Sequence, residues 1–177
     1  MSDVFQKSKG TDSSSMMQRR TDKELRQALH AALRRGASVV LATVSADGKP
    51  SSAFCSWVLS LGNDQIAVAL DSRSTGHRNI STGNISVALE VLADNLIVSV
   101  RGLATIAKEQ LRSVPFPCAL VTVSIAEVRD HAVPGVHFHA PHYIWADGKE
   151  HRGEVERAIF EELAESQLLN DPKITEP

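Results

Sequence analysis

The ten residues from Asp71 to Ile80 bring hydroxyl, guanidinium and imidazole groups together in one short run: Asp71-Ser72-Arg73-Ser74-Thr75-Gly76-His77-Arg78-Asn79-Ile80. Hydroxyls and backbone N–H groups at the start of a short helix can donate to phosphate oxygens, and that end of a helix is electropositive. An arginine adds a charged fork that binds phosphate through two hydrogen bonds. The pattern therefore predicts a phosphate-binding loop. The alternative that local composition leaves open is a solvated polar loop with a helix cap at Ser74 or Thr75.

A second candidate region is the predicted strand at residues 51–61, which mixes small polar and aromatic side chains. Alternation along a strand divides its residues into two faces, Ser52, Phe54, Ser56 and Val58 on one and Ala53, Cys55, Trp57 and Leu59 on the other. A two-residue turn at Asp47-Gly48 would place Phe54 opposite Leu41 and Ser56 opposite Val39. A face that is both polar and aromatic suits a flat heteroaromatic ligand. A half-exposed strand with Trp57 in the core is the alternative.

Two further clusters carry weaker signals. The turn at Asp94-Asn95 predicts that Glu90 lies opposite Ser99 with Arg101 diagonal to it, which gives either a polar pocket or an ordinary surface ion pair. Late in the chain stand five histidines, His131, His137, His139, His142 and His151. No carboxylate or cysteine near them completes a known ligand spacing, so we expect hydrogen-bonding or pocket-lining histidines in preference to a metal site. The chain also lacks a G-x-S-x-G motif, so nothing favours a nucleophilic triad.

The elements that position these residues follow from hydrophobic periodicity. Thr21 and Glu24 form a capping box, and leucines at helical spacing then predict a helix over residues 22–35. A period of two predicts strands at residues 39–45, 51–61, 65–70, 85–92, 96–107 and 118–128, with a further strand at 136–145. Turn residues between neighbouring strands indicate antiparallel pairing. A final helix is expected at 154–169, with an apolar stripe made of Val155, Ile159, Phe160 and Leu163.

Five to seven short antiparallel strands in one domain are best accommodated by a closed or nearly closed barrel, because closure removes exposed strand edges. The sequence therefore predicts a mainly β fold, a small antiparallel β-barrel with flanking helices. Residues 1–20 are polar and have little to bury, so we expect a disordered tail followed by a single domain over 21–177.

Composition limits the function classes. The chain has 177 residues, 42% hydrophobic and 23% charged, which fits one globular domain. A net charge of −2 argues against nucleic acid or an anionic membrane as partner, because both need clustered lysine and arginine. The two cysteines, Cys55 and Cys118, lie in hydrophobic stretches and resemble buried thiols of a reducing compartment. No apolar run reaches the roughly 20 residues that span a bilayer, so we expect a soluble, cytoplasmic protein.

Taken in order, four segments resemble the pyridoxamine 5′-phosphate oxidase-like flavoproteins, the FMN-binding split β-barrels. They are Leu41-Ala42-Thr43-Val44-Ser45-Ala46-Asp47-Gly48-Lys49-Pro50, the serine and aromatic strand that follows it, Ser74-Thr75-Gly76-His77-Arg78-Asn79-Ile80 and Ile85-Ser86-Val87-Ala88-Leu89. The likeness covers residues 37–107, and the order and spacing of the segments carry it. The resemblance implies an antiparallel split β-barrel that forms a homodimer, with FMN in a cleft between the two barrels.

The resemblance also implies a set of cofactor-binding residues. On the ring side of the flavin they are Phe54, Cys55, Ser56, Trp57, Leu70 and Asp71. On the phosphate side they are Ser72, Arg73, Ser74, Thr75, His77, Arg78 and Asn79. The partner subunit would close the flavin site from its C-terminal part, through Trp145 or a late histidine. Many members carry a lysine where this chain has Gly76, so Arg73 or Arg78 would supply the cation here.

The resemblance implies an FMN-dependent oxidoreductase that acts on an unidentified small molecule. The family's signature for pyridoxal-type substrates is missing from the late sequence, which argues against pyridoxamine phosphate oxidase activity itself. Flavin chemistry needs few side chains, so no acid or base is assigned, although His77 or a late histidine could relay a proton. Two alternatives stay open. One is a haem-binding or haem-degrading protein, since residues 76–80 resemble a segment of such relatives, and the other is a flavin-binding module without turnover.

Overall fold

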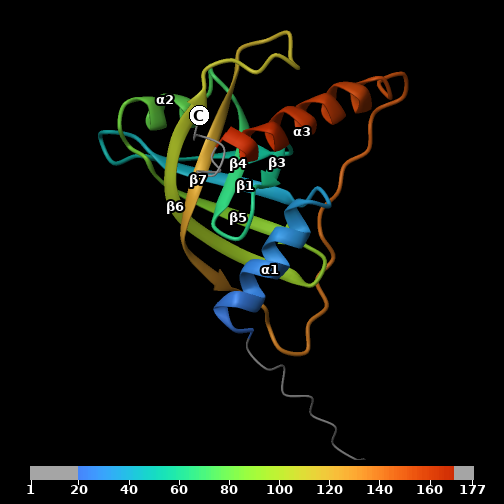
Figure 1. Ribbon diagram of the computed structural model, residues 1–177. Coiled ribbons are helices and arrows are strands. Elements are labelled where there is room, and N and C mark those ends of the chain that lie inside the picture. Colours follow the sequence, from blue (N-terminus) through green and yellow to red (C-terminus); the bar gives the residue numbers. More distant parts are fainter. Residues whose placement is uncertain (1–19, 170–177) are drawn as a thin grey trace, which may run out of the picture.

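The computed structural model describes residues 20–169 and consists of one seven-stranded antiparallel sheet with three helices (Figure 1). Strand order in the sheet is β2-β1-β5-β6-β7-β4-β3. The strands are β1 Ser38–Val44, β2 Pro50–Cys55, β3 Val58–Ser60, β4 Gln65–Asp71, β5 Ser86–Ala93, β6 Leu96–Lys108 and β7 Cys118–Asp130. The helices are α1 Asp22–Leu33, α2 Thr75–Ser81 and α3 Arg152–Leu169.

Helix α1 forms where the capping box predicts it. The backbone N–H of Glu24 donates to Thr21 Oγ1 at 3.3 Å, and Thr21 N–H donates to Glu24 Oε2 at 2.8 Å. The helix buries Leu25, Leu29 and Leu33 against one end of the barrel. Of the predicted tail, only Arg20 is described, and its guanidinium lies 3.5 Å from the carboxylate of Asp130. The other tail residues, 1–19, lie outside the described residues.

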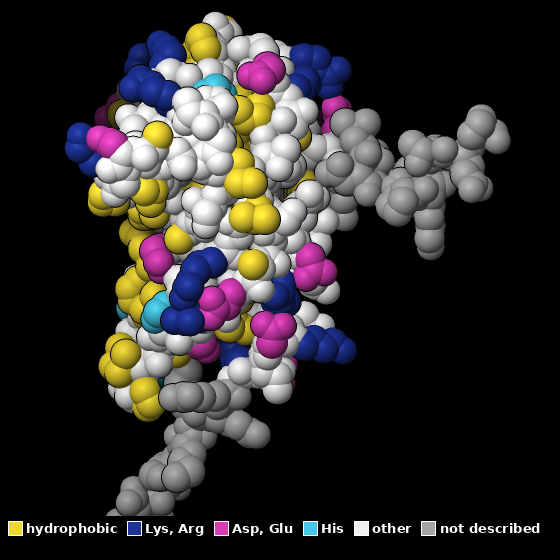
Figure 2. Space-filling model, turned by 90° about the vertical axis from the view of Figure 1, so that its left-hand side faces the viewer, with side chains coloured by type: hydrophobic (Ala, Val, Ile, Leu, Met, Phe, Trp, Pro, Cys, Tyr) yellow, Lys and Arg dark blue, Asp and Glu magenta, His cyan; other side chains and the backbone are white. Residues whose placement is uncertain are grey.

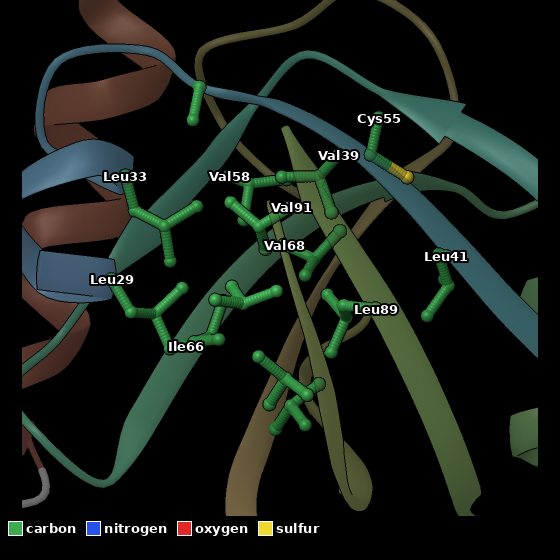
Figure 3. Close-up of a cluster of buried hydrophobic side chains, with 14 of the residues drawn as sticks. Leu29, Leu33, Val39, Leu41, Cys55, Val58, Ile66, Val68, Leu89 and Val91 are labelled. Atoms are coloured by element: carbon green, nitrogen blue, oxygen red, sulfur yellow. The ribbon is translucent and has the colours of Figure 1, made fainter. Parts of the chain in front are cut away.

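The sheet rolls into a barrel because its two edge strands follow one another in the chain. Only Ser56 and Trp57 separate β2, at one edge, from β3, at the other. These two edges therefore have to lie close together, although β2 and β3 are not hydrogen-bonded neighbours. The inward side chains fill the barrel, with Val39, Leu41, Ile66, Val68, Leu89 and Val91 among them (Figure 3).

The prediction of one continuous strand at 51–61 was wrong. The break at Ser56-Trp57 changes the alternation, so Cys55 and Val58 both point into the barrel core, whereas an unbroken strand would put them on opposite faces. The predicted register of the first hairpin is also off by one, because Val40 pairs with Phe54. The turn has three residues in place of two, and Gly48 takes the left-handed conformation (φ +81°) that such a turn requires.

The hairpin at Asp94-Asn95 has the predicted register, with Glu90 opposite Ser99. The guanidinium of Arg101, however, lies 3.4 Å from Glu127 on β7, and this is an ordinary exposed ion pair.

The predicted strand at 136–145 was wrong: residues 131–151, here called the strap, contain no strand. The strap runs alongside α1 from the end of β7 to α3 (Figure 1). Side chains of the β5–β6 turn take the hydrogen bonds that a neighbouring strand would provide, since Asn95 Oδ1 accepts from Phe138 N–H at 3.2 Å and Asp94 Oδ1 from Ala140 N–H at 2.9 Å. Midway along the strap, Ser38 Oγ donates to the carbonyl of Pro141 at 2.8 Å.

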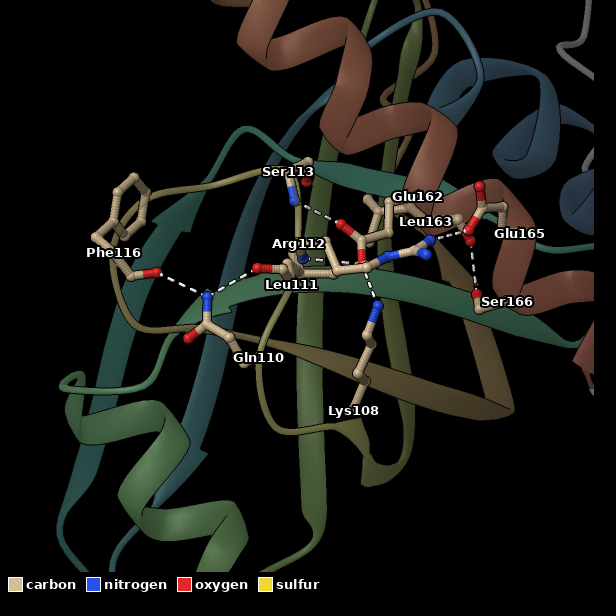
Figure 4. A network of polar contacts seen from close by, with 10 residues as sticks. All are labelled: Lys108, Gln110, Leu111, Arg112, Ser113, Phe116, Glu162, Leu163, Glu165 and Ser166. Atoms are coloured by element: carbon tan, nitrogen blue, oxygen red, sulfur yellow. Dashed lines mark hydrogen bonds and ion pairs between the residues drawn. The ribbon is translucent and has the colours of Figure 1, made fainter.

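Helix α3 covers the outer face of β3 and β4 through a second hydrophobic cluster. Ile159 and Leu163 of the predicted stripe are fully buried there, whereas Val155 is exposed. The carboxylate of Glu162 joins α3 to the β6–β7 connection, because it accepts from Lys108 Nζ, from Arg112 N–H at 3.0 Å and from Ser113 N–H at 2.9 Å (Figure 4). Among the described residues, no helix is both long and apolar enough to cross a membrane.

Candidate functional site

The predicted phosphate loop connects β4 to helix α2 on the outside of the barrel. Ser74 is the N-cap of α2, since its Oγ accepts from His77 N–H at 3.1 Å. Gly76, Asn79 and Ile80 are buried and hold the helix against the barrel wall. The Asn79 amide donates to Thr43 Oγ1 on β1 at 2.9 Å. Asn79 is thus engaged in attaching α2 to the sheet.

The two arginines of the loop stand in different electrostatic situations. Arg73 is bound to Asp71, with Nε 3.0 Å and Nη2 2.6 Å from its carboxylate oxygens. The hydrogen bonds from the Arg73 side chain and backbone lower the pKa of Asp71 to about 2, so this pair stays charged on both sides. Arg78 is exposed, and its guanidinium has no ion-pair partner within residues 20–169. Of the two candidate cations, Arg78 is the one without an ion-pair partner in the described residues, whereas Arg73 is paired with Asp71.

Two polar atoms of the loop are buried without a hydrogen-bond partner in the described part of the chain: Ser72 Oγ and His77 Nε2. Buried polar atoms are nearly always bonded, and an unmade bond costs about 1 to 3 kcal/mol. Both atoms belong to the predicted phosphate side. As potential donors in the same loop as the start of α2 and Arg78, they fit an anion such as the phosphate of FMN.

The predicted ring-side residues divide into two groups. Phe54 is 60% exposed on the edge strand β2, and Ser56 is half-buried where that strand ends. Cys55 and Leu70 point into the barrel core, so only their backbone groups can face an external ligand. Burial raises the pKa of the Cys55 thiol to about 11, which keeps it protonated and unreactive.

Trp57 is held in a structural contact. Its ring stacks on Phe116, with centroids 6.1 Å apart and planes inclined by 27°. The indole lies against the second hydrophobic cluster, where the sequence alternative of a core tryptophan placed it.

The sequence did not predict a cavity of about 480 Å³ that Trp145 helps to line. It lies among the end of α1, the β2–β3 break, the strap and α3, and its lining residues are Arg34, Arg35, Gly36, Ser38, Ser56, Leu59, Pro141, His142, Tyr143, Trp145, Glu156 and Phe160. Trp145 was expected to reach a partner's flavin. In this chain it shares a cavity with Ser56 of the same subunit. No local pattern signals the cavity, because its walls come from segments that lie far apart in the sequence.

Three of the late histidines have defined surroundings in the structure. His131 Nε2 lies 2.8 Å from Ser99 Oγ, and His142 lines the 480 Å³ cavity. His137 lines a second cavity, beside the β5–β6 turn. In the residues that the structure describes, no three histidine, cysteine or acidic side chains are grouped to hold a metal.

Solved structures share this architecture. An FMN-binding protein of Syntrophomonas wolfei matches with a TM-score of 0.53 and 16% identity, over 63% of this chain and 89% of that one. A pyridoxamine 5′-phosphate oxidase-like protein of Listeria innocua matches with a TM-score of 0.50 and 15% identity, over 61% and 98%. The chain has the split-barrel fold of these proteins. At such identities the match establishes the split barrel and nothing finer.

A haem-binding protein of Mycobacterium smegmatis has the same split barrel, with a TM-score of 0.51 and 14% identity over 67% of this chain and 57% of that one. The sequence matches no protein-family model and no curated protein. The split-barrel neighbours therefore include both flavin-binding and haem-binding proteins.

Proposed function

We propose that this split-barrel protein binds FMN and is an FMN-dependent oxidoreductase that acts on a small molecule. The observation that carries the proposal is the pair of buried, unpartnered atoms Ser72 Oγ and His77 Nε2 in the loop that also carries the exposed Arg78. A dianionic phosphate at this place would supply the missing hydrogen bonds and pair with the guanidinium. The proposal is supported by the S. wolfei protein, an FMN-binding protein with the same fold.

Each part of the site has a separate task. Ser72, Thr75, His77 and Arg78 hold the phosphate, and the exposed edge of β2 at Phe54 and Ser56 supports the ring. When bound, FMN supplies the capacity to accept a hydride or two electrons. The protein positions the ring and limits solvent access. The ring N–H of His77, within this loop, would donate to the phosphate, and neither buried thiol takes part.

We further propose that the protein is a homodimer that covers the flavin ring with the outer face of β2, β1, β5 and β6. Exposed hydrophobic side chains lie along this face, including Phe54, Val44 and Leu103 at 60%, 45% and 52% exposure. On the side of the molecule where β6 lies, charged side chains gather above and below a middle zone that is mostly hydrophobic or uncharged (Figure 2). Apolar patches of this kind are typical of self-complementary interfaces between subunits.

The decisive experiment compares stability and FMN affinity in Ser72→Ala. Removing an unpartnered buried hydroxyl should leave the free energy of unfolding of the flavin-free protein unchanged or slightly higher. The same change should raise the Kd for FMN about five- to tenfold, because the hydroxyl would bond the phosphate. Flavin fluorescence quenching measures the second effect and urea unfolding the first. A Ser72→Ala protein that binds FMN as tightly as wild type would refute the phosphate site.

Arg78→Gln tests the cation. Loss of a charge-assisted contact to phosphate corresponds to about 1.5 to 3 kcal/mol, so the Kd for FMN should rise at least tenfold. Arg129→Gln is the matched control, since Arg129 is an exposed arginine of β7 that is paired with Glu127. Equal FMN binding by the two variants would contradict the assignment of Arg78. Bleaching of the bound flavin by NADPH or NADH would then separate an oxidoreductase from a module that only stores flavin.

Haem is the second candidate, and His77 favours it specifically. Its Nε2 is unpartnered in the described structure, and a neutral imidazole nitrogen is a common axial ligand of haem iron. Haem added to the protein should then give a Soret band that His77→Ala abolishes. If the wild-type protein gives no such band while FMN binds, the haem hypothesis fails.

A further inference from the structure

The 480 Å³ cavity beside the proposed flavin site has the size and walls of a small-molecule pocket. Tyr143 and Trp145 of the strap form one wall, with ring centroids 5.6 Å apart and planes inclined by 71°. Phe160 of α3 and Leu59 of β3 add apolar surface. These side chains favour a flat, largely apolar ligand.

The rim of the same cavity is positively charged. Arg34 and Arg35 stand at the end of α1 and are exposed, and neither guanidinium has a hydrogen bond or an ion pair within the described residues. Glu156 is the carboxylate among the lining residues, and it accepts a hydrogen bond from the hydroxyl of Tyr143. Two unpaired cations against one carboxylate that is already bonded leave an excess of positive charge, which favours an anionic ligand.

Ser56 connects the cavity to the proposed flavin site. Ser56 and Tyr143 both line the cavity, and the hydroxyl of Tyr143 donates to the carboxylate of Glu156. Ser56 is also the first residue after β2, two positions beyond the exposed Phe54. A ligand in the cavity would therefore lie next to the strand edge that we assign to the flavin ring.

We propose that this cavity binds a small planar aromatic carboxylate, with its ring against Tyr143 and Trp145 and its carboxylate toward Arg34 and Arg35. An acid of this class is then the substrate of the flavin site, an assignment that rests on the proposed function. The structural alternative is that both arginines only stabilise the C-terminal end of α1, where cations are favourable. That alternative predicts no dependence of ligand binding on the two guanidinium groups.

The test uses 2-naphthoate as the aromatic acid and 2-naphthalenemethanol as its neutral counterpart, with flavin-free protein. The chain has two tryptophans, so Trp57→Phe leaves Trp145 as the single fluorescent reporter, and a phenylalanine keeps a ring against Phe116. Naphthoate should quench this fluorescence saturably. Calorimetric titration of the wild-type protein gives the same Kd without relying on a variant that has to fold.

The expected result is that Arg34→Gln combined with Arg35→Gln weakens naphthoate binding about tenfold, while Arg129→Gln leaves it unchanged. The neutral alcohol should bind weakly to all three proteins. Equal affinity of naphthoate for the double variant and the wild type overturns the proposal, and so does equal affinity of acid and alcohol.

A second measurement separates this proposal from that of FMN binding. Ser72→Ala and Arg78→Gln should keep their affinity for naphthoate, because neither residue lines the cavity. In the FMN-loaded wild-type protein, naphthoate should shift the visible absorption of the flavin, because the two ligands would lie side by side. Naphthoate binding without such a shift overturns the substrate assignment. If the protein does not bind FMN at all, the flavin fluorescence titration will show this, and the naphthoate titrations of the flavin-free protein will be unaffected.

Discussion

Replacing Glu162 by glutamine should destabilise the protein by about 3 kcal/mol at neutral pH. Burial by itself would raise the pKa of this carboxyl, which is only 7% exposed, but hydrogen bonds from Arg112 N–H, Lys108 and Ser113 N–H outweigh burial and lower it to about 2. A decrease from 4.5 to about 2 corresponds to roughly 3 kcal/mol of stabilisation. The loss of one partner from a buried ion pair is of the same size, about 3 to 5 kcal/mol. Glutamine keeps the shape but turns an NH2 group toward donors.

The effect of Glu162→Gln should depend on pH. The group titrates near 4.5 when unfolded and near 2 when folded, so its contribution is complete above about pH 5 and is lost as the pH falls toward 2. Urea unfolding followed by circular dichroism at pH 7, 5, 4 and 3 measures this. The difference between the wild type and the variant should shrink steadily below pH 5.

Glu165→Gln is the matched control on the same helix. Its carboxylate is 59% exposed and lies 2.6 Å from Arg112 Nη2, so the change should cost no more than about 1 kcal/mol. If Glu162→Gln is no more destabilising than Glu165→Gln, or if its effect is the same at pH 7 and pH 3, the reasoning is wrong. A loosened α3 would also displace Glu156 and Phe160, so naphthoate binding should weaken in parallel.

Two further substitutions test how the barrel holds the site. Gly102→Ala should cost about 1 to 3 kcal/mol in thermal unfolding, because a Cβ there would stand 2.4 Å from a carbonyl oxygen of β7. Gly76→Ala is the control and should stay within about 1 kcal/mol of wild type, because the atoms nearest to its Cβ would be 3.8 Å away. Equal melting temperatures for the two variants would contradict this packing. Asn79→Ala should lower the free energy of unfolding by about 1 to 3 kcal/mol, because it leaves the buried hydroxyl of Thr43 without its partner. A change in FMN affinity with no loss of stability would show that Asn79 binds the ligand instead.

Features encoded by neighbouring residues could be predicted from the sequence. The Thr21 capping box, the Ser74 cap of α2 and the register at the Asp94-Asn95 turn each depend on contacts within a few positions, and each is present in the structure. The split barrel itself could be expected from the strand count and from the resemblance of residues 37–107. The predicted strand at 136–145 is absent because its backbone bonds to Asp94 and Asn95 of the turn between β5 and β6 and not to a neighbouring strand.

The candidate site could likewise be predicted from the sequence only in part. That hydroxyls and arginines gather at residues 71–80 is plain from the sequence alone. Which arginine is free, however, depends on Asp71 binding Arg73, and which polar atoms are orphaned depends on how α2 packs on β1. The break at Ser56-Trp57 has no local signal, because the closing of the barrel imposes it by joining the two sheet edges.

The sequence alone thus determined the cap of α2, the hairpin turns and the polar character of the loop, because each depends only on residues a few positions apart. Tertiary structure alone decided the cavity, which brings Arg34, Tyr143 and Glu156 together from more than a hundred residues of chain. No pattern within a single segment can report such a meeting, because it exists only after the sheet has curled and the strap and α3 have packed against it.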